Sequence, residues 1–269
     1  MTNRLRKKVV PESTHNERYA ALNPQFTPLP GLALGATDSA HGVFFGRENG
    51  RDVAVKPYVN GDDPHGKAEH ERRMYDITAG LGFLTLKPVK VIFDGTRHAY
   101  LVTEHDPNLV SLLSVSPGSQ GYFGLIRGAA ATLGRFHSAG MIHGDAQVKN
   151  FGANRGQVEE GLPGQTMIFD FERTGPTESV SDHRTHSYDL GKLSESLAFT
   201  NFGNTYNLDL ASAALEHHVL DPWGEQARVT IPQKEIDRAK AEAYTRFIDR
   251  FTARLREGRH TSRRHNRAA

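Results

Sequence analysis

The chain has no cysteine, and several kinds of chemistry are thereby excluded. Disulfide frameworks, thiolate zinc sites and cysteine nucleophiles all need a residue that the sequence lacks. It also has no run of about 18 apolar residues, so no transmembrane helix is expected. The basic N-terminus is not followed by an apolar segment, so a secretory signal peptide is not expected either. These absences favour a cytoplasmic protein.

Neither sign of charge dominates the 269 residues, but the charges are unevenly distributed. Lys and Arg number 33 against 31 Asp and Glu, and the formal net charge is +2. Residues 246–269 nevertheless contain eight Arg and two acids, whereas residues 9–245 have a net charge of −8. A basic tail of this kind can bind nucleic acid or another anionic surface through phosphate contacts. The alternative is a solvated helix end with a frayed tail.

The order of the predicted elements indicates an α+β fold with a small sheet-rich lobe and a larger, mainly helical lobe. Residues 1–30 contain four prolines and are expected to be an irregular extension. We assign the sheet-rich lobe to residues 31–104, the helical lobe to residues 105–258 and a basic tail to residues 259–269. The length of the chain and its apolar share of 37% allow a sizeable core.

The individual elements are predicted from turn signals and apolar spacing. Asn49-Gly50 separates two short alternating segments and predicts a tight hairpin. The last helix is expected to stop at Gly258, and Trp223, the only Trp, is expected to be a packed loop anchor. The other expected elements are helices over 66–80, 121–138, 188–198, 208–218 and 232–257, and strands over 86–93, 99–103, 149–153 and 166–170.

The first lobe contains residues suited to binding phosphate. The segment from Gly35 to Gly42 lies between the first two apparent strands, and glycines there allow backbone N–H groups to approach a phosphate. Lys56 lies in the apolar strand V-A-V-K, where a buried ammonium needs a carboxylate partner. Glu71 on the following helix is our candidate for this partner, and Glu69 is its competitor on another face. Taken singly, a glycine-containing turn, a solvent-facing Lys and a solvated Glu are the alternative interpretations.

The second lobe contains a loop and a strand end that suit proton and metal chemistry. His143 begins the loop H-G-D-A-Q-V-K-N, in which Asp145 and Asn150 are five positions apart. A carboxylate there can orient a hydroxyl and accept its proton, and an amide oxygen can bind a hard cation. Asp170 follows the apolar strand M-I-F, and a carboxylate at a strand end is suited to Mg²⁺. An ordinary turn Asp is the alternative interpretation of Asp170.

These features occur in an order that resembles the protein-kinase-like phosphotransferase superfamily. The resemblance implies a two-lobed protein-kinase-like fold that uses ATP and Mg²⁺. It implies that Lys56 binds the α- and β-phosphates and pairs with Glu71. It further implies that Asp145 aligns the acceptor hydroxyl and that Asn150 and Asp170 hold Mg²⁺.

The resemblance extends over about residues 31–200 and also implies supporting roles. His143 matches the structural His of the catalytic loop, and Asp189 matches the helix Asp that braces this loop. Residues Glu104 to Asp106, which include His105, would form the hinge between the lobes, whose backbone meets adenine.

Departures from the superfamily pattern indicate its atypical and small-molecule branch. Gly144 replaces the Arg that reads a phosphate on the activation segment of ordinary protein kinases. Glu172 replaces the Gly of D-F-G, and Asp189 follows Asp170 by only 19 positions, too few for a peptide-docking segment. The branch includes lipopolysaccharide core kinases, RIO-like kinases, aminoglycoside and choline phosphotransferases, and the small KEOPS-complex kinase. The compact length and the pattern E-R-R-M-Y-D-I-T-A-G-L-G favour the lipopolysaccharide and KEOPS-like group.

We therefore predict a phosphotransferase that moves the γ-phosphate of ATP to a hydroxyl of a small molecule, glycan or protein. Lys149 is a second candidate catalytic residue, because its ammonium could reach the γ-phosphate, and Gln147 stands where Ser/Thr kinases usually carry Lys. The alternative is a kinase-like nucleotide-binding or nucleic-acid-associated regulatory protein without turnover. The partners that these predictions allow are ATP, an unidentified hydroxyl acceptor and, through the basic tail, a weakly bound nucleic acid or anionic surface.

Overall fold

The computed structural model describes residues 12–29, 42–59, 62–117, 121–160, 166–179, 185–199 and 207–265. The chain forms two compact units. Unit 1 comprises Met1–Ile77 and Leu86–Pro107, and unit 2 comprises Thr78–Thr85 and Asn108–Ala269.

The elements of unit 1 are two helices and five strands among its described residues. They are α1 (Glu12–Leu22), β1 (Phe26–Pro28), β2 (Phe44–Glu48), β3 (Arg51–Val59), α2 (Pro64–Gly80, whose last turn belongs to unit 2), β4 (Pro88–Phe93) and β5 (His98–Glu104).

The described residues of unit 2 form a mainly helical body with short strands. Its helices are α3 (Tyr122–Ser138), α4 (Arg155–Glu160), α5 (His186–Phe199), α6 (Leu208–Leu215), a π-helix (Glu216–Leu220), α7 (Asp221–Ala227) and α8 (Gln233–His265). Short 3₁₀ turns are η1 (Leu112–Ser114), η2 (Val148–Asn150) and η3 (Thr177–Ser179). Its strands are β6 (Leu109–Ser111), β7 (Met141–Ile142), β8 (Phe151–Asn154), β9 (Met167–Ile168) and β10 (Gly175–Pro176).

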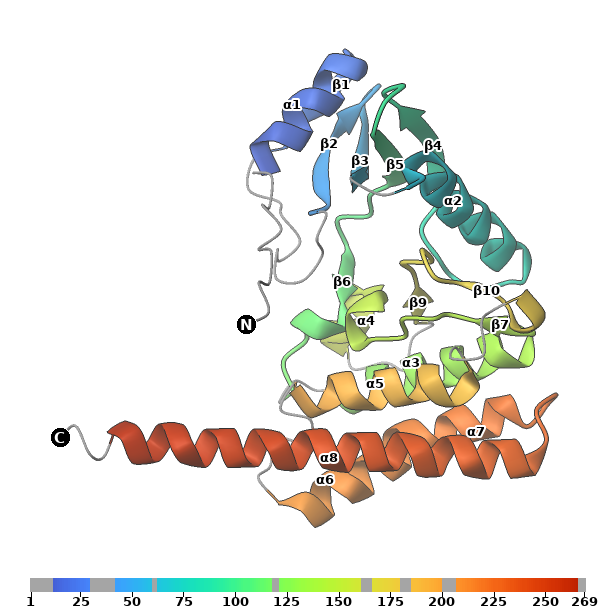
Figure 1. The fold of residues 1–269 in the computed structure, drawn as a ribbon, viewed down its shortest axis with the longest axis vertical. Helices are drawn as coiled ribbons and strands as arrows, with labels where there is room; N and C mark the ends of the chain where they lie inside the picture. The colour runs from blue at the N-terminus through green and yellow to red at the C-terminus, as the bar shows by residue number, and fades with distance from the viewer. Residues whose placement is uncertain are drawn as a thin grey trace. The chain divides into compact units, whose positions relative to one another are not determined.

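Unit 1 is an antiparallel sheet of strand order β1-β2-β3-β5-β4, with α1 and α2 on opposite faces (Figure 1). The predicted hairpin is confirmed: Asn49 and Gly50 join β2 to β3 with φ values of 51° and 78°. Both angles are positive, as a two-residue turn of this type requires. The face toward α1 buries a cluster that includes Tyr19, Phe44 and Tyr100.

The expectation that residues 1–30 form an irregular extension was wrong for residues 12–28. They form α1 and β1, and Tyr19 and Phe26 are buried in the sheet core. Proline did not prevent this, because β1 lies at the sheet edge, where Pro28 needs no second strand partner. The hydrophobic pattern that would have shown this is short, since only a few side chains of α1 face the sheet.

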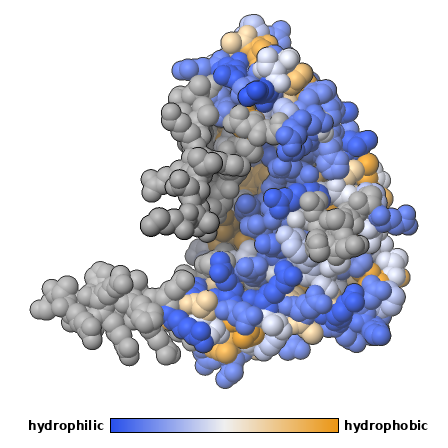
Figure 2. Space-filling model, viewed as in Figure 1, coloured by the Kyte–Doolittle hydropathy of each residue, from blue (hydrophilic) through white to orange (hydrophobic). Residues whose placement is uncertain are grey.

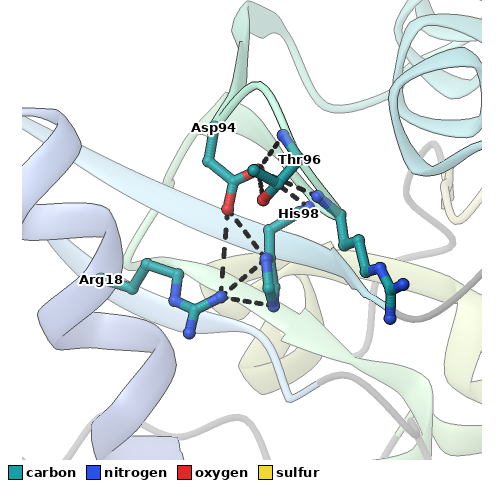
Figure 3. A network of polar contacts seen from close by, with 5 residues as sticks. Arg18, Asp94, Thr96 and His98 are labelled. Carbon is teal, nitrogen blue, oxygen red and sulfur yellow. Dashed lines mark hydrogen bonds and ion pairs between the residues drawn. The ribbon is translucent and has the colours of Figure 1, made fainter.

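A polar network also fastens α1 to the turn between β4 and β5 (Figure 3). Arg18 Nη1 lies 2.7 Å from both ring nitrogens of His98, and His98 Nδ1 lies 2.8 Å from Asp94 Oδ2. Asp94 Oδ1 accepts hydrogen bonds from the backbone N–H and the hydroxyl of Thr96. Burial opposes ionisation of this carboxyl, but the Thr96 and His98 hydrogen bonds outweigh it and hold the pKa of Asp94 well below its usual range.

In unit 2, α3 packs against α7, and α5 packs along α8 (Figure 1). The apolar residues of α3 recur at helical spacing and are fully buried, among them Leu125, Ala129, Leu133 and Phe136. The short strands pair as β6-β8-β9 and β7-β10, and they flank the segments that carry the candidate catalytic residues.

Two expectations for unit 2 need correction. The last helix does not stop at Gly258 but continues to His265, because the residues around this glycine include good helix formers and no proline follows. Trp223 is not in a loop: it lies in α7 and is fully buried. The connection between β8 and β9 contains α4. The side chains beyond Arg256, which include the basic tail 259–269, lie outside the described residues.

The described surface on the face drawn in Figure 2 is mostly hydrophilic, and its apolar residues form separate small patches. This agrees with a mean hydropathy of −0.54. Within the described ranges, no helix combines the length and the apolar character needed to span a membrane.

Candidate active site

Lys56 on β3 is paired with Glu71 on α2 within unit 1. Lys56 Nζ lies 2.7 Å from Glu71 Oε2, and the Glu71 carboxylate is fully buried while 17% of the Lys56 side chain is exposed. The alternation of β3 places Lys56 on the sheet face toward α2, and Glu71 faces the sheet from that helix. A buried carboxylate requires such a partner, so the pair holds the ammonium in one position.

Tyr58 is a second donor to the same carboxylate, and this contact was not predicted from the sequence. Its hydroxyl donates to Glu71 Oε2, and the Lys56 ammonium lies 5.3 Å from the centre of the Tyr58 ring. Residues two apart in a strand share a face, so the spacing of Lys56 and Tyr58 could have indicated the contact. Glu71 is therefore held by two donors from one strand.

The competing acid on α2 is placed differently. Glu69 Oε2 accepts a hydrogen bond from Arg72 Nε at 2.7 Å, and both side chains are exposed to about the same extent. Glu69 and Arg72 thus form a solvated surface pair, which contributes little to stability. Of the glycines in the predicted phosphate loop, Gly42 lies just before β2, and Gly35 lies outside the described residues.

Glu104 and His105 lie at the end of β5. The Glu104 carboxylate is 3.0 Å from Lys87 Nζ, and the His105 backbone N–H donates to the carbonyl of Asp52 at 3.0 Å. The His105 ring packs against Phe45 with ring centres 4.5 Å apart, and burial lowers its pKa. Burial thus favours the neutral form of the His105 ring.

In unit 2 the loop from His143 is bound to Asp189 on α5. Asp189 Oδ2 accepts the backbone N–H of His143 at 2.7 Å, and its Oδ1 accepts that of Gly144 at 2.8 Å. The carboxylate is fully buried and lies in the first turn of α5, where the helix dipole favours negative charge. Asp189 thus fixes the backbone immediately before Asp145.

Backbone geometry explains why this loop has glycine at position 144. The φ angle of Gly144 is +78°, which an L side chain rarely adopts. A Cβ atom there would lie 2.5 Å from the carbonyl oxygen of Arg173. The local fold therefore excludes the arginine that ordinary protein kinases carry at this position.

Two amide side chains fix the segment that follows. Gln147 Nε2 donates to Asp145 Oδ1 at 2.7 Å, and Asn150 Nδ2 donates to the backbone carbonyl of Asp145 at 2.7 Å. Gln147 was noticed only as a departure from the kinase pattern, and its contact with the Asp145 carboxylate was not foreseen. Lys149 lies in η2, where its backbone carbonyl accepts the hydroxyl of Ser111 at 3.2 Å.

The backbone brings Asn150 and Asp170 to neighbouring positions. Phe169, the residue before Asp170, donates its N–H to the carbonyl of Asn150 at 3.1 Å. The Phe169 carbonyl accepts a hydrogen bond from His143 Nε2 at 3.0 Å, which ties the loop to the same segment. Asp170 has a φ of 69°, in the left-handed region, which is uncommon for residues with a Cβ although Asp adopts it more readily than most. Non-glycine residues in this region cluster at active sites.

The donor set of this segment fits a hard divalent cation. The carboxylate of Asp170 and the amide oxygen of Asn150 are oxygen ligands of the kind that Mg²⁺ prefers. Two protein ligands are usual for Mg²⁺, which keeps several waters or binds phosphate oxygens as well. Glu172, two residues beyond Asp170, is exposed.

Comparisons with known proteins agree with this geometry. The profile of the lipopolysaccharide kinase (Kdo/WaaP) family matches residues 66–217. A solved structure of WaaP in complex with acyl carrier protein has a TM-score of 0.53 and 17% identity, covering 90% of this chain and 92% of that chain. An aminoglycoside-3'-phosphotransferase of type VIII has a TM-score of 0.55 and 16% identity, covering 88% of this chain and 98% of its own. A search of curated proteins finds no match. The two structural likenesses confirm the expected protein-kinase-like α+β fold.

Proposed function

The chain belongs to the lipopolysaccharide kinase (Kdo/WaaP) family, and we propose that it transfers the γ-phosphate of ATP to an acceptor hydroxyl with the help of Mg²⁺. Family membership makes it a phosphotransferase, whereas the nucleotide, the metal and the acceptor are part of the proposal. One observation carries it: Asp145 and Asn150 are fixed to one another in a loop whose backbone is bound to Asp189. Phosphoryl transfer depends on such positioning more than on covalent help from the protein.

The chemistry assigned to Asp145 is that of a positioned base. Its carboxylate would accept a hydrogen bond from the acceptor hydroxyl and take up the proton as the new O–P bond forms and the bond to ADP breaks. Gln147 holds one carboxylate oxygen of Asp145, which leaves the group in a defined orientation. When bound by Asn150 and Asp170, Mg²⁺ would neutralise negative charge on the phosphates.

The residues of unit 1 are assigned to the nucleotide. Lys56 would bind the α- and β-phosphates, and Glu71 with Tyr58 fixes its ammonium. Glu104 and His105 would meet the adenine through their backbone, and Gly35 and Gly42 would belong to the phosphate loop. A positive charge fixed by a buried partner needs no reorganisation during the reaction, and it is therefore effective in stabilising phosphate charge.

Lys149 stays a candidate for contact with the γ-phosphate. Its backbone is fixed in η2 between Gln147 and Asn150, in the same loop as Asp145. If the Lys149 ammonium contacts the γ-phosphate during transfer, Lys149→Ala should lower kcat. Unchanged turnover in this variant would contradict the assignment.

We propose a sugar hydroxyl as the acceptor. The family is defined by a lipopolysaccharide kinase, and the aminoglycoside phosphotransferase of similar fold is named for another carbohydrate-containing acceptor. The acyl carrier protein in the WaaP structure is a partner of that protein. No contact among the described residues of this chain favours such a partner here.

The proposal is tested with γ-labelled ATP and Mg²⁺ offered with lipopolysaccharide, with an aminoglycoside and with a desalted lysate re-supplemented with its small metabolites. Asp145→Asn serves as the blank, because it keeps the size of the side chain and removes the carboxylate. We expect label in a carbohydrate-containing fraction from the wild type and a loss of at least about 100-fold in the variant. Label that is independent of Asp145, or Asp145-dependent label only in protein, would contradict the assignment of the base or of the acceptor, respectively.

A further inference from the structure

A line of buried hydrogen bonds connects α7 to the loop that carries Asp145. Trp223 Nε1 donates to His137 Nδ1 at 3.0 Å, and His137 Nε2 lies 3.1 Å from Asp189 Oδ2. Trp223 and Asp189 are 0% exposed and His137 is 1% exposed. The same Asp189 carboxylate binds the backbone immediately before Asp145, so Trp223 is linked to the loop through two side chains.

The donors and acceptors in this line define the state of His137. An indole N–H can only donate, so His137 Nδ1 must present its lone pair to Trp223. The other ring nitrogen then carries the proton and donates it to the Asp189 carboxylate. The reverse tautomer would place two N–H groups against each other at Trp223 and two acceptors against each other at Asp189, in a site without solvent.

Asp189 depends on this arrangement because it is a buried charge. Three N–H groups reach its carboxylate in the described part of unit 2: those of His143, Gly144 and the His137 ring. The first two belong to the loop itself, so the His137 ring is the one donor that is independent of the loop. Without the His137 donor, the described contacts of the Asp189 carboxylate would be reduced to the His143 and Gly144 amides, which are the groups that Asp189 positions.

The position of Trp223 is itself fixed by close packing of α7 on α3. A Cβ atom at Gly134 of α3 would lie 2.4 Å from the backbone oxygen of Trp223, so glycine allows this approach. The Ser138 hydroxyl donates to the carbonyl of Gln226 at 2.7 Å and clamps the end of α7 to the end of α3. The indole N–H is therefore held at a constant place beside His137.

We propose that Trp223 is a positioning residue for phosphoryl transfer, selecting the His137 tautomer that holds Asp189 and thereby the loop of Asp145. Trp223 acts through His137 and Asp189 and touches no reacting atom. The structural part concerns the free protein, and only its kinetic consequence rests on the proposed function.

The structural part is tested without any substrate. In the wild type labelled with ¹⁵N-histidine, His137 should show the neutral Nε2–H tautomer, and the single Trp should give one hydrogen-bonded indole N–H signal. In Trp223→Phe, which removes the donor and keeps an aromatic ring, we expect a mixture of His137 tautomers. We also expect hydrogen exchange of the His143 and Gly144 amides to become at least about tenfold faster. A wild-type His137 in the Nδ1–H form would overturn the proposal even if the variant did not fold.

The kinetic part uses a matched control for the loss of stability. Trp223→Phe should lower kcat by about 10- to 100-fold and leave the KM for ATP within about twofold, because loop alignment is lost while the nucleotide residues of unit 1 are unchanged. Phe247→Leu removes core volume from α8 but none of the three side chains of this line, and it should leave kcat within about twofold at temperatures well below its midpoint. Unchanged kcat in Trp223→Phe, or an equal loss in Phe247→Leu, would show that Trp223 has no positioning role. If the wild type transferred no phosphate at all, the proposed function would fail, and the tautomer and exchange measurements would still decide whether Trp223 holds the loop.

Discussion

The candidate lysine of unit 1 is held by charge, whereas the candidate catalytic loop of unit 2 is held by neutral N–H groups around one buried carboxylate. Lys56 faces Glu71 across 2.7 Å, and its side chain retains 17% exposure. Asp189 is fully buried, and the donors that reach it are two backbone amides and one neutral imidazole. The two arrangements solve different problems: one fixes a movable cation, and the other fixes a stretch of backbone.

The difference predicts how each unit responds to damage. When the acid of a buried pair is replaced by its amide and the base keeps some contact with water, the cost in stability is moderate and the loss is mainly functional. When a buried carboxylate is removed from backbone donors, those donors have no solvent to replace it, and the fold itself loses free energy. Substitutions in the two units should therefore separate function from stability.

The largest effect is expected from Asp189→Ala. The change leaves the N–H groups of His143, Gly144 and His137 without an acceptor in a buried site. We expect the free energy of unfolding to fall by about 3–5 kcal/mol, measured by chemical denaturation. Asp189→Asn, which can still accept some of these hydrogen bonds, should cost less. A loss below about 1 kcal/mol in Asp189→Ala would show that the loop does not depend on this carboxylate.

The sequence made part of this arrangement predictable. Asp189 was found through its place after the H-G-D loop, because the resemblance to kinases assigns a helix Asp to that task. Trp223 could not be found in this way: His137 lies in the segment R-F-H-S-A-G-M-I-H-G-D, but Trp223 is 86 positions away and belongs to no short motif. Only the packing of α7 on α3 brings them together, and apolar spacing indicates that a residue is buried without indicating which polar group it meets.

The next effect concerns unit 1 and compares two acids on one helix. Glu71→Gln keeps the size of the side chain but removes the charge that fixes Lys56, so we expect kcat/KM for ATP to fall by about 100-fold, equivalent to about 2.7 kcal/mol. The free energy of unfolding should fall by about 1–3 kcal/mol, less than in Asp189→Ala, because the amide can still accept from Tyr58 and the Lys56 side chain is 17% exposed. Steady-state kinetics and denaturation on the same preparation measure both quantities.

Glu69→Gln is the matched control, since Glu69 lies two positions away on α2 and its carboxylate pairs with Arg72 at the surface. It should change kcat/KM for ATP by no more than about twofold and the free energy of unfolding by no more than about 0.5 kcal/mol. Equal losses in the two variants would mean that the charge of α2 matters in general and that the pair with Lys56 does not.

The preference for Glu71 over Glu69 came from the sequence, because Met74, Ile77 and Thr78 were expected to share its side of the helix. Met74 and Thr78 are buried in the structure, whereas Ile77 is 39% exposed. Tyr58 was missed although it follows Lys56 at strand spacing, since an aromatic residue in an apolar strand is interpreted first as core. The assignment of residues 12–28 to an irregular extension was wrong for a different reason. The four prolines of residues 1–30 outweighed the few sheet-facing residues of α1, yet β1 pairs only along one edge, where Pro28 is tolerated.

The smallest expected effect is on the pH dependence of stability, which should differ between the two units. Burial lowers the pKa of His186 from 6.5 to about 4, and its ring lies 4.8 Å from that of His137. The unfolded chain therefore takes up this proton at a higher pH than the folded chain does, so stability is complete above about pH 6.5 and declines as the pH falls toward 4. We expect His186 to account for about 1–2 kcal/mol of that decline, allowing for partial contact with solvent.

His186→Gln should reduce the decline in free energy of unfolding between pH 7 and pH 4.5, whereas His217→Gln, at an exposed position on the π-helix, should leave it unchanged. Because His186 adjoins the hydrogen bonds that link Trp223, His137 and Asp189, the protection of the His143 and Gly144 amides, corrected for the intrinsic exchange rate at each pH, should fall over the same range. The protection of β3 amides beside Lys56 should not follow. A parallel loss of protection in both units would mean that acid acts on the whole chain rather than on the buried histidines.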